Sequence, residues 1–179
     1  MNSSAALSSN PYDYISGDEE FNGIVNLGND ALPVLQNKIS QSPNNGLQEY
    51  IAAIAIERIA KVDLKKNEST AWETAKGFTD KWKKYLKNIP SSVDSIVMDN
   101  QKNTDEKVKE LVELGTPAIP FIAEKIEAGD EQLFPVLIEL TKGNGNKIVA
   151  DASITNKKEW VTQNKSTFND LKQYVLDQQ

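Results

Sequence analysis

Two charged residues stand inside the most apolar segment of this chain, residues 50–60. Glu57 and Arg58 interrupt a run made largely of alanine and isoleucine. A charged group among apolar neighbours must be paired or must reach solvent, so this pair could bind a ligand or form an internal ion pair that positions one. We favour a simpler interpretation, in which both lie with Gln48 and Glu49 on the one wet strip of a helix, because arginine stems often extend along apolar surface to water.

The tryptophans Trp72, Trp82 and Trp160 are a second group that could line a binding groove for a sugar or a peptide. Aromatic side chains at helical spacing are more often core residues, and we favour that role for Phe78 and Tyr85. For Trp72 and Trp160 both roles stay open, because each stands near the predicted start of a helix, where one ring edge can remain exposed. The candidate ligand-binding residues are Glu57, Arg58, Trp72 and Trp160.

The residue types that are missing limit the chemistry further. The chain has no cysteine, so it has no disulfide, no thiolate metal site and no cysteine nucleophile. It also has no histidine, which is the commonest general base and the commonest metal ligand. Carboxylate pairs such as Glu57 with Asp63 could support hydrolysis, but nothing in the spacing selects one pair. We therefore expect no catalytic residue, no metal site and no cofactor.

One segment has the outline of a calcium-binding loop, but its spacing argues against that role. The sixth place of such a loop needs glycine for its sharp turn, and Thr104 stands there. The sequence from Thr104 onward also reads as a helix. We predict a linker followed by a helix cap instead. The residues that make up the outline are Asp99, Gln101, Asn103, Asp105 and Glu110.

Charge argues against a nucleic-acid partner, and hydropathy argues against a transmembrane segment. The 26 acidic and 20 basic side chains give a net charge of −6, and Arg58 is the only arginine. Nucleic-acid binding needs a basic face and favours arginine, so we expect no nucleic-acid partner. The longest strongly apolar stretch, residues 50–56, is far shorter than a membrane-spanning helix, so we expect no transmembrane segment.

Breaker residues and helix caps divide the chain into two similar units. We predict a flexible N-terminal arm at 1–17, a first helical unit at 18–88, a linker at 89–103 and a second helical unit at 104–179. Each unit reads as about four helices, and the fold class is all-α. The linker is expected because Pro90 and its serine neighbours break helical periodicity.

A nine-residue phrase occurs once in each predicted unit. Residues 27–35 read LGNDALPVL, and residues 114–122 read LGTPAIPFI. In both copies a glycine ends one helix, because glycine adopts left-handed backbone angles without steric cost. A proline then stands in the first turn of the next helix, where its missing N–H costs nothing. Repetition of this kind indicates a fold built from copies of one helical module.

The repeated phrase resembles the corner of a HEAT-type helical hairpin. This resemblance implies an α-solenoid type of packing. The similar unit is about twice the usual length and occurs only twice, so we expect two HEAT-like units packed as a short curved superhelix or bundle. The whole chain also resembles uncharacterised extracytoplasmic, lipoprotein-like proteins of Gram-positive bacteria, for which no activity is implied. An extracytoplasmic or cell-surface location with a lipid tether upstream is therefore expected, with a cytoplasmic location as the alternative.

These observations favour a non-enzymatic scaffold, a monomer that presents a helical surface to a protein or peptide partner. The alternative is a ligand-binding protein or hydrolase that uses carboxylates and tryptophans in a cleft between the units. A structural spacer is a third hypothesis. A deep pocket with two or more buried acids would favour the alternative, whereas a shallow open groove would favour the scaffold.

Overall fold

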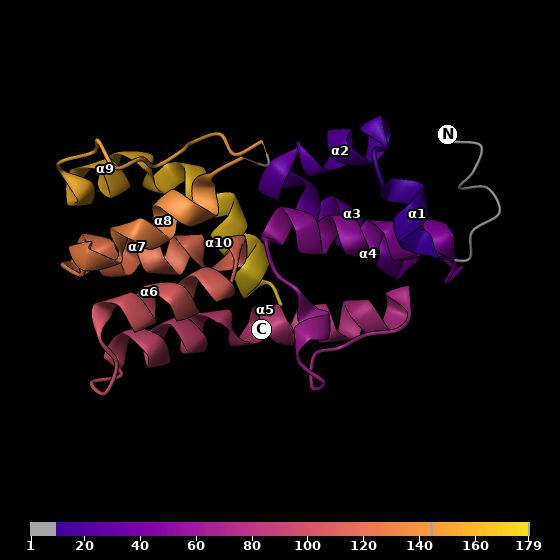
Figure 1. Cartoon of the computed structure of the whole chain (residues 1–179), viewed down its shortest axis with the longest axis horizontal. Helices are drawn as coiled ribbons and strands as arrows, with labels where there is room; N and C mark the ends of the chain where they lie inside the picture. Colours follow the sequence, from indigo (N-terminus) through magenta and orange to yellow (C-terminus); the bar gives the residue numbers. More distant parts are fainter. Residues whose placement is uncertain (1–9, 144, 179) are drawn as a thin grey trace.

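The computed structural model describes residues 10–143 and 145–178, and the helices of this part of the chain gather in two lobes (Figure 1). The helix α5 (Ala75–Met98) runs along one side of both lobes. Since the described residues contain helices and no strand, the predicted all-α class is confirmed for them. The N-lobe consists of α1 (Pro11–Ile15), α2 (Glu19–Val25), α3 (Ala31–Gln41) and α4 (Leu47–Ala60). The C-lobe consists of α6 (Thr104–Glu113), α7 (Ile119–Ala128), α8 (Phe134–Thr141), α9 (Lys157–Asn164) and α10 (Asn169–Leu176).

The predicted N-terminal arm covers two different parts of the chain. Residues 1–9 lie outside the described residues. Residues 11–15 form α1, which begins after Asn10, whose side chain accepts a hydrogen bond from the backbone N–H of Tyr12. Ile15 at the end of α1 is buried in the core, so this short helix packs against the N-lobe.

The central helix of the N-lobe, α4, contains the whole apolar segment 50–60. It packs against α2, α3 and α5. Ala53, Ile56, Ile59 and Ala60 on it are fully buried. A helix that is apolar on nearly every side needs neighbours on nearly every side, and the small alanines let those neighbours approach closely.

The helix α5 continues through much of the segment predicted as a linker. Residues 89–98 form its last part, whereas the sequence predicts a linker over 89–103. A proline inside a helix costs about 3 kcal/mol, and Pro90 lies inside α5. The cost is offset because Leu86, Ile89 and Val93 continue one buried stripe past the proline. With 24 residues, α5 is about 36 Å long, so it can contact both lobes.

The two copies of the repeated phrase form similar corners, and these corners meet between the lobes. Each glycine has a positive φ, 68° at Gly28 and 76° at Gly115; a 3₁₀ turn begins at Gly28 in the first copy and just after Gly115 in the second, and a helix follows each turn. The Thr116 hydroxyl donates a hydrogen bond of 2.6 Å to the side-chain oxygen of Asn29. Asn29 and Thr116 occupy the same place in the phrase, so the lobes contact each other through equivalent positions.

A chain of buried side-chain hydrogen bonds joins three helices near this meeting point. The Trp82 indole on α5 donates to the Tyr174 hydroxyl on α10 at 2.7 Å. The Tyr174 hydroxyl in turn donates to Gln36 on α3. Because each polar group is buried, each needs its partner, and the network fixes how the three helices lie relative to one another.

Gly115 gives a direct test of the corner packing. A Cβ at this position would lie 2.2 Å from the carbonyl oxygen of Ala60 and 2.5 Å from Val62. We expect Gly115→Ala to lower the free energy of unfolding by more than about 3 kcal/mol, because a backbone carbonyl cannot move aside cheaply. Urea denaturation followed by circular dichroism measures this change.

Gly17 provides a control for the positive φ, which is 71° there, because nothing lies within 4 Å of an added Cβ. Gly17→Ala should cost only the backbone strain, about 1–2 kcal/mol. Equal losses for the two variants would contradict the proposed close contact at the corner.

Candidate functional site

An open groove lies where the end of α4 faces α5 and α6, and we call it the α4–α6 groove. It encloses about 1040 Å³. Residues 61–70 of the segment that connects α4 to α5 form one of its walls. The charged side chains that line it are Glu57, Arg58, Lys61, Asp63, Lys66, Glu110 and Glu113. The apolar and aromatic side chains that line it are Tyr12, Val62, Leu64, Tyr85, Ile96, Val112 and Leu114.

Glu57 is buried in the wall of this groove, with 9% of its surface exposed. One of its carboxylate oxygens accepts two hydrogen bonds, from the backbone N–H of Leu64 at 2.9 Å and from the Trp72 indole at 3.1 Å. The carboxylate therefore fastens the segment after α4 back onto α4. Burial raises the pKa of the Glu57 carboxyl, and these two hydrogen bonds oppose part of the shift.

The prediction that four residues share one solvent-exposed strip of α4 is wrong for two of them. Glu57 and Glu49 are both buried, whereas Arg58 and Gln48 are exposed. Arg58 lies over the ring of Phe21 on α2, with 5.4 Å from the guanidinium carbon to the ring centroid. The adjacent charges thus face different surroundings, because successive residues on a helix point about 100° apart.

The two candidate tryptophans occupy separate places. Trp72 is 4% exposed, stands next to Glu57, and packs against the rings of Tyr50 and Phe78. Trp160 is half-buried on α9 and meets Phe134 edge-on at 5.5 Å. The structure therefore brings Glu57 and Trp72 into contact and places Arg58 in the lining of the α4–α6 groove, while Trp160 lies in the C-lobe and lines neither this groove nor the recess described below.

Lys61 is a groove residue that sequence analysis does not identify. Among the described residues it is the one non-glycine with a positive φ, 55°, and it ends α4. Its ammonium donates to the backbone oxygens of Glu139 and Lys142, at 2.8 and 2.6 Å, and so caps the end of α8 in the C-lobe. Burial lowers the pKa of this ammonium. The signal in the sequence is that α4 ends without a glycine, so another residue must adopt the left-handed backbone angles there.

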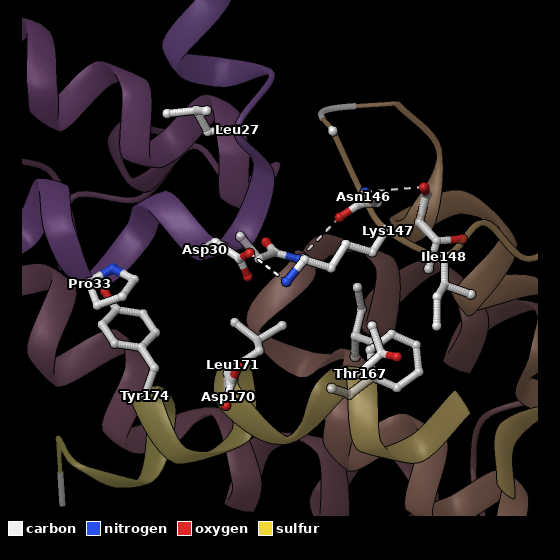
Figure 2. A pocket seen from close by; sticks show the side chains of 15 residues that line it. Leu27, Asp30, Pro33, Asn146, Lys147, Ile148, Thr167, Asp170, Leu171 and Tyr174 are labelled. Atoms are coloured by element: carbon white, nitrogen blue, oxygen red, sulfur yellow. Dashed lines mark hydrogen bonds and ion pairs between the residues drawn. The ribbon is translucent and has the colours of Figure 1, made fainter. Parts of the chain in front are cut away.

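A second, smaller recess of about 250 Å³ lies between the lobes, and Figure 2 shows its lining. The Lys147 ammonium forms an ion pair of 2.6 Å with Asp30 beside this recess. Asn146 accepts a hydrogen bond from Asn29 at 3.2 Å. Apolar side chains from α10, including Leu171, form part of the lining. These polar contacts tie the loop after α8 to the corner before α3.

The outlined calcium loop is occupied by the chain's own lysine. The Lys102 ammonium contacts the carboxylates of Asp99 and Glu110, at 3.3 and 2.6 Å. The side chain of Asn103 caps α6 by accepting from the backbone N–H of Glu106. In the described part of the chain, no group of three or more acidic, histidine or cysteine residues is arranged to hold a metal ion.

Comparisons with known proteins give no relative: no family model, no curated protein and no solved structure matches the chain. None of the helices within residues 10–143 and 145–178 is long and apolar enough to cross a membrane. The function must therefore be argued from the geometry of the site.

Glu57 and Glu49 give a paired test by pH. The folded-state pKa of Glu57 is raised, so its contribution to stability is present below its unfolded pKa of about 4.3 and is lost as pH rises through the folded value. In Glu57→Gln the amide oxygen can still accept both hydrogen bonds, without a buried charge. Relative to wild type, we expect this variant to gain stability as pH rises from 4 to 7.

Glu49→Gln should change stability in the opposite direction. Hydrogen bonds from the Ser42 hydroxyl and the chain around Gly46 lower the pKa of Glu49, so its contribution is present above its unfolded pKa and is lost as pH falls. Urea denaturation at several pH values measures both differences. Two difference curves of the same sign would contradict the assigned roles.

Glu57→Ala leaves two hydrogen-bond donors unpaired. It should lower the free energy of unfolding by about 1–3 kcal/mol for each donor.

Proposed function

We propose that this protein is a non-enzymatic module that binds a protein or peptide segment in the α4–α6 groove. The observation that carries the proposal is the shape and lining of that groove, which is open and about 1040 Å³ in volume. Apolar side chains and charges of both signs line it. Surfaces that bind chain segments combine apolar contacts with a charged, hydrated rim.

The acids of the groove favour this proposal over a hydrolase or small-ligand site. Glu57 is the buried acid among them, and its carboxylate already accepts two hydrogen bonds. Asp63 and Glu113 are exposed. Glu110 is ion-paired with Lys102. A carboxylate-based hydrolase needs two acids positioned on either side of a bond, so the alternative has less support.

We further propose that the two corners belong to two HEAT-like units packed as a short curved bundle. The shared positive-φ glycines and the contact between equivalent positions Asn29 and Thr116 support this arrangement. Under this proposal the protein acts as a monomer, outside the cytoplasm, tethered to lipid upstream of this chain. A signal sequence followed by a cysteine in the native upstream sequence would support that location.

A charge swap within the groove tests the proposed function. Peptides are first selected from a displayed random library on the wild-type protein, and their dissociation constants are then measured by fluorescence anisotropy. The double variant Lys66→Glu/Glu113→Lys exchanges one basic and one acidic charge of the groove at constant net charge. We expect it to weaken the binding of selected peptides about tenfold, as two rim contacts of roughly 0.7 kcal/mol each would produce.

The control is Asp80→Lys/Lys83→Glu, a second charge swap at exposed positions of α5 outside the groove. It should leave the dissociation constants unchanged. The proposal fails if no peptide is selected or if both swaps act equally. A sugar or small acid that binds wild type but not the groove variant would favour the alternative function.

A further inference from the structure

The ammonium of Lys65 lies inside a cluster of three aromatic rings, which we call the aromatic cage. Its nitrogen is 4.0 Å from the ring centroid of Trp72, 4.9 Å from that of Tyr50 and 5.7 Å from that of Tyr12. It also donates a hydrogen bond of 2.6 Å to the Tyr50 hydroxyl. Three rings within 6 Å of one cation form the arrangement that recognises substituted ammonium groups, because each ring face carries partial negative charge.

The cage is held in place independently of Lys65. Its rings come from α1, α4 and the segment before α5. The Trp72 indole is fixed by its hydrogen bond to the buried carboxylate of Glu57. The rings of Tyr50 and Trp72 pack against each other, with centroids 4.7 Å apart and planes tilted by 50°. The base of the cage is therefore built from packed rings and a buried hydrogen bond.

One side of the cage opens to solvent. Trp72 is 4% exposed, whereas Tyr12 is 42% exposed. Lys65 itself is half-buried in a short 3₁₀ turn, Leu64–Lys66, and its stem enters the cage from that turn. A lysine side chain has four rotatable bonds, so it can leave the cage without a change in the backbone.

From this geometry we infer that the aromatic cage is a binding site for an alkylammonium or quaternary ammonium group, and that Lys65 occupies it as an intramolecular competitor. The rings supply the attraction for the cation, and the carboxylate of Glu57 behind Trp72 adds negative charge. The cage shares Tyr12 with the lining of the α4–α6 groove, whereas Tyr50 and Trp72 do not line that groove, so the cage can bind a cation whether or not the groove binds peptides.

Intramolecular occupation sets the expected strength of binding. A group attached by a short flexible linker competes at an effective concentration of the order of millimolar. An external cation must therefore displace Lys65 from the wild-type protein, whereas it meets an open cage in Lys65→Ala. We expect the variant to bind a quaternary ammonium more tightly than wild type does, by a factor that rises with the fraction of wild-type molecules whose cage holds Lys65.

Choline is the probe, and its neutral isostere 3,3-dimethylbutan-1-ol is the matched control ligand. Binding is followed through the three indole N–H signals in nitrogen-15 NMR spectra, with the Trp72 signal identified in a Trp72→Phe spectrum. For Lys65→Ala, choline should shift the Trp72 signal saturably, and the neutral alcohol should not. Tyr12→Ala in the same background removes the exposed ring and should weaken choline binding severalfold.

Lys65→Ser is a second variant that also leaves the cage open, for use if Lys65→Ala does not fold, because serine is well tolerated in turns. It too should bind choline more tightly than wild type, because its short side chain cannot fill the space between the rings. A folded variant with no saturable shift would overturn the inference. Equal shifts with choline and the neutral alcohol, or equal affinities of wild type and variant, would also overturn it.

The source of the ammonium group is distinguished by a further arm of the same titration. The affinity of free trimethyllysine is compared with that of a peptide that contains trimethyllysine. Equal affinities indicate a site for small cations, and a tighter peptide indicates a lysine side chain presented by a chain segment. The result is separable from the groove test, since Lys66→Glu/Glu113→Lys leaves all three rings of the cage in place.

Discussion

The fold depends on one close approach, that of the second glycine corner to the end of α4. Gly115 can lie against the carbonyl of Ala60 because it has no side chain. The residue that follows Ala60 then adopts left-handed backbone angles, so the chain leaves α4 without obstructing the corner. This residue is Lys61, and its side chain caps α8 in the opposite lobe. The contact between Gly115 and the end of α4 therefore ends a helix, positions the second glycine corner and joins the two lobes.

Polar contacts around this junction give the apolar interface its specificity. Apolar packing alone permits many relative orientations of two lobes, since it is not directional. The Thr116–Asn29 contact and the buried chain from Trp82 through Tyr174 to Gln36 are satisfied in only one of them. Every buried side-chain polar atom among the described residues has a hydrogen-bond partner. A shifted lobe would leave several of these groups unpaired, at about 1–3 kcal/mol each.

Sequence analysis predicts the parts of this fold that local signals determine. The position of α4 follows from its apolar run, and the glycine turns before α3 and α7 follow from the repeated phrase. The start of α5 does not. Thr70 and Glu73 suggest a capping box, whereas Thr74 is the cap, accepting a hydrogen bond from Gly77, and the Thr70 hydroxyl donates to the backbone of Leu64. That role exists only once the segment 61–74 has folded back onto α4, which no local pattern encodes.

The same limit applies to the candidate site. Sequence analysis selects Glu57, Arg58 and Trp72 as candidates. It does not predict that Glu57 and Trp72 are joined by a hydrogen bond. Lys65, Tyr12 and Tyr50 come from three separate segments, so their spacing carries no signal. Only the tertiary fold brings their side chains together.

Glu57 connects the fold to both proposed binding regions. By accepting from Leu64 and from Trp72, it holds the segment 61–74 at two points. This segment supplies a wall of the α4–α6 groove and, through Trp72, a ring of the aromatic cage. A buried carboxylate costs stability that an apolar residue would not, and its raised pKa reflects that cost. An apolar residue could fill the space, but it could not hold the Leu64 backbone and the Trp72 ring in one arrangement. Positioning of this segment is therefore the physical reason for a charge at the centre of the most apolar helix.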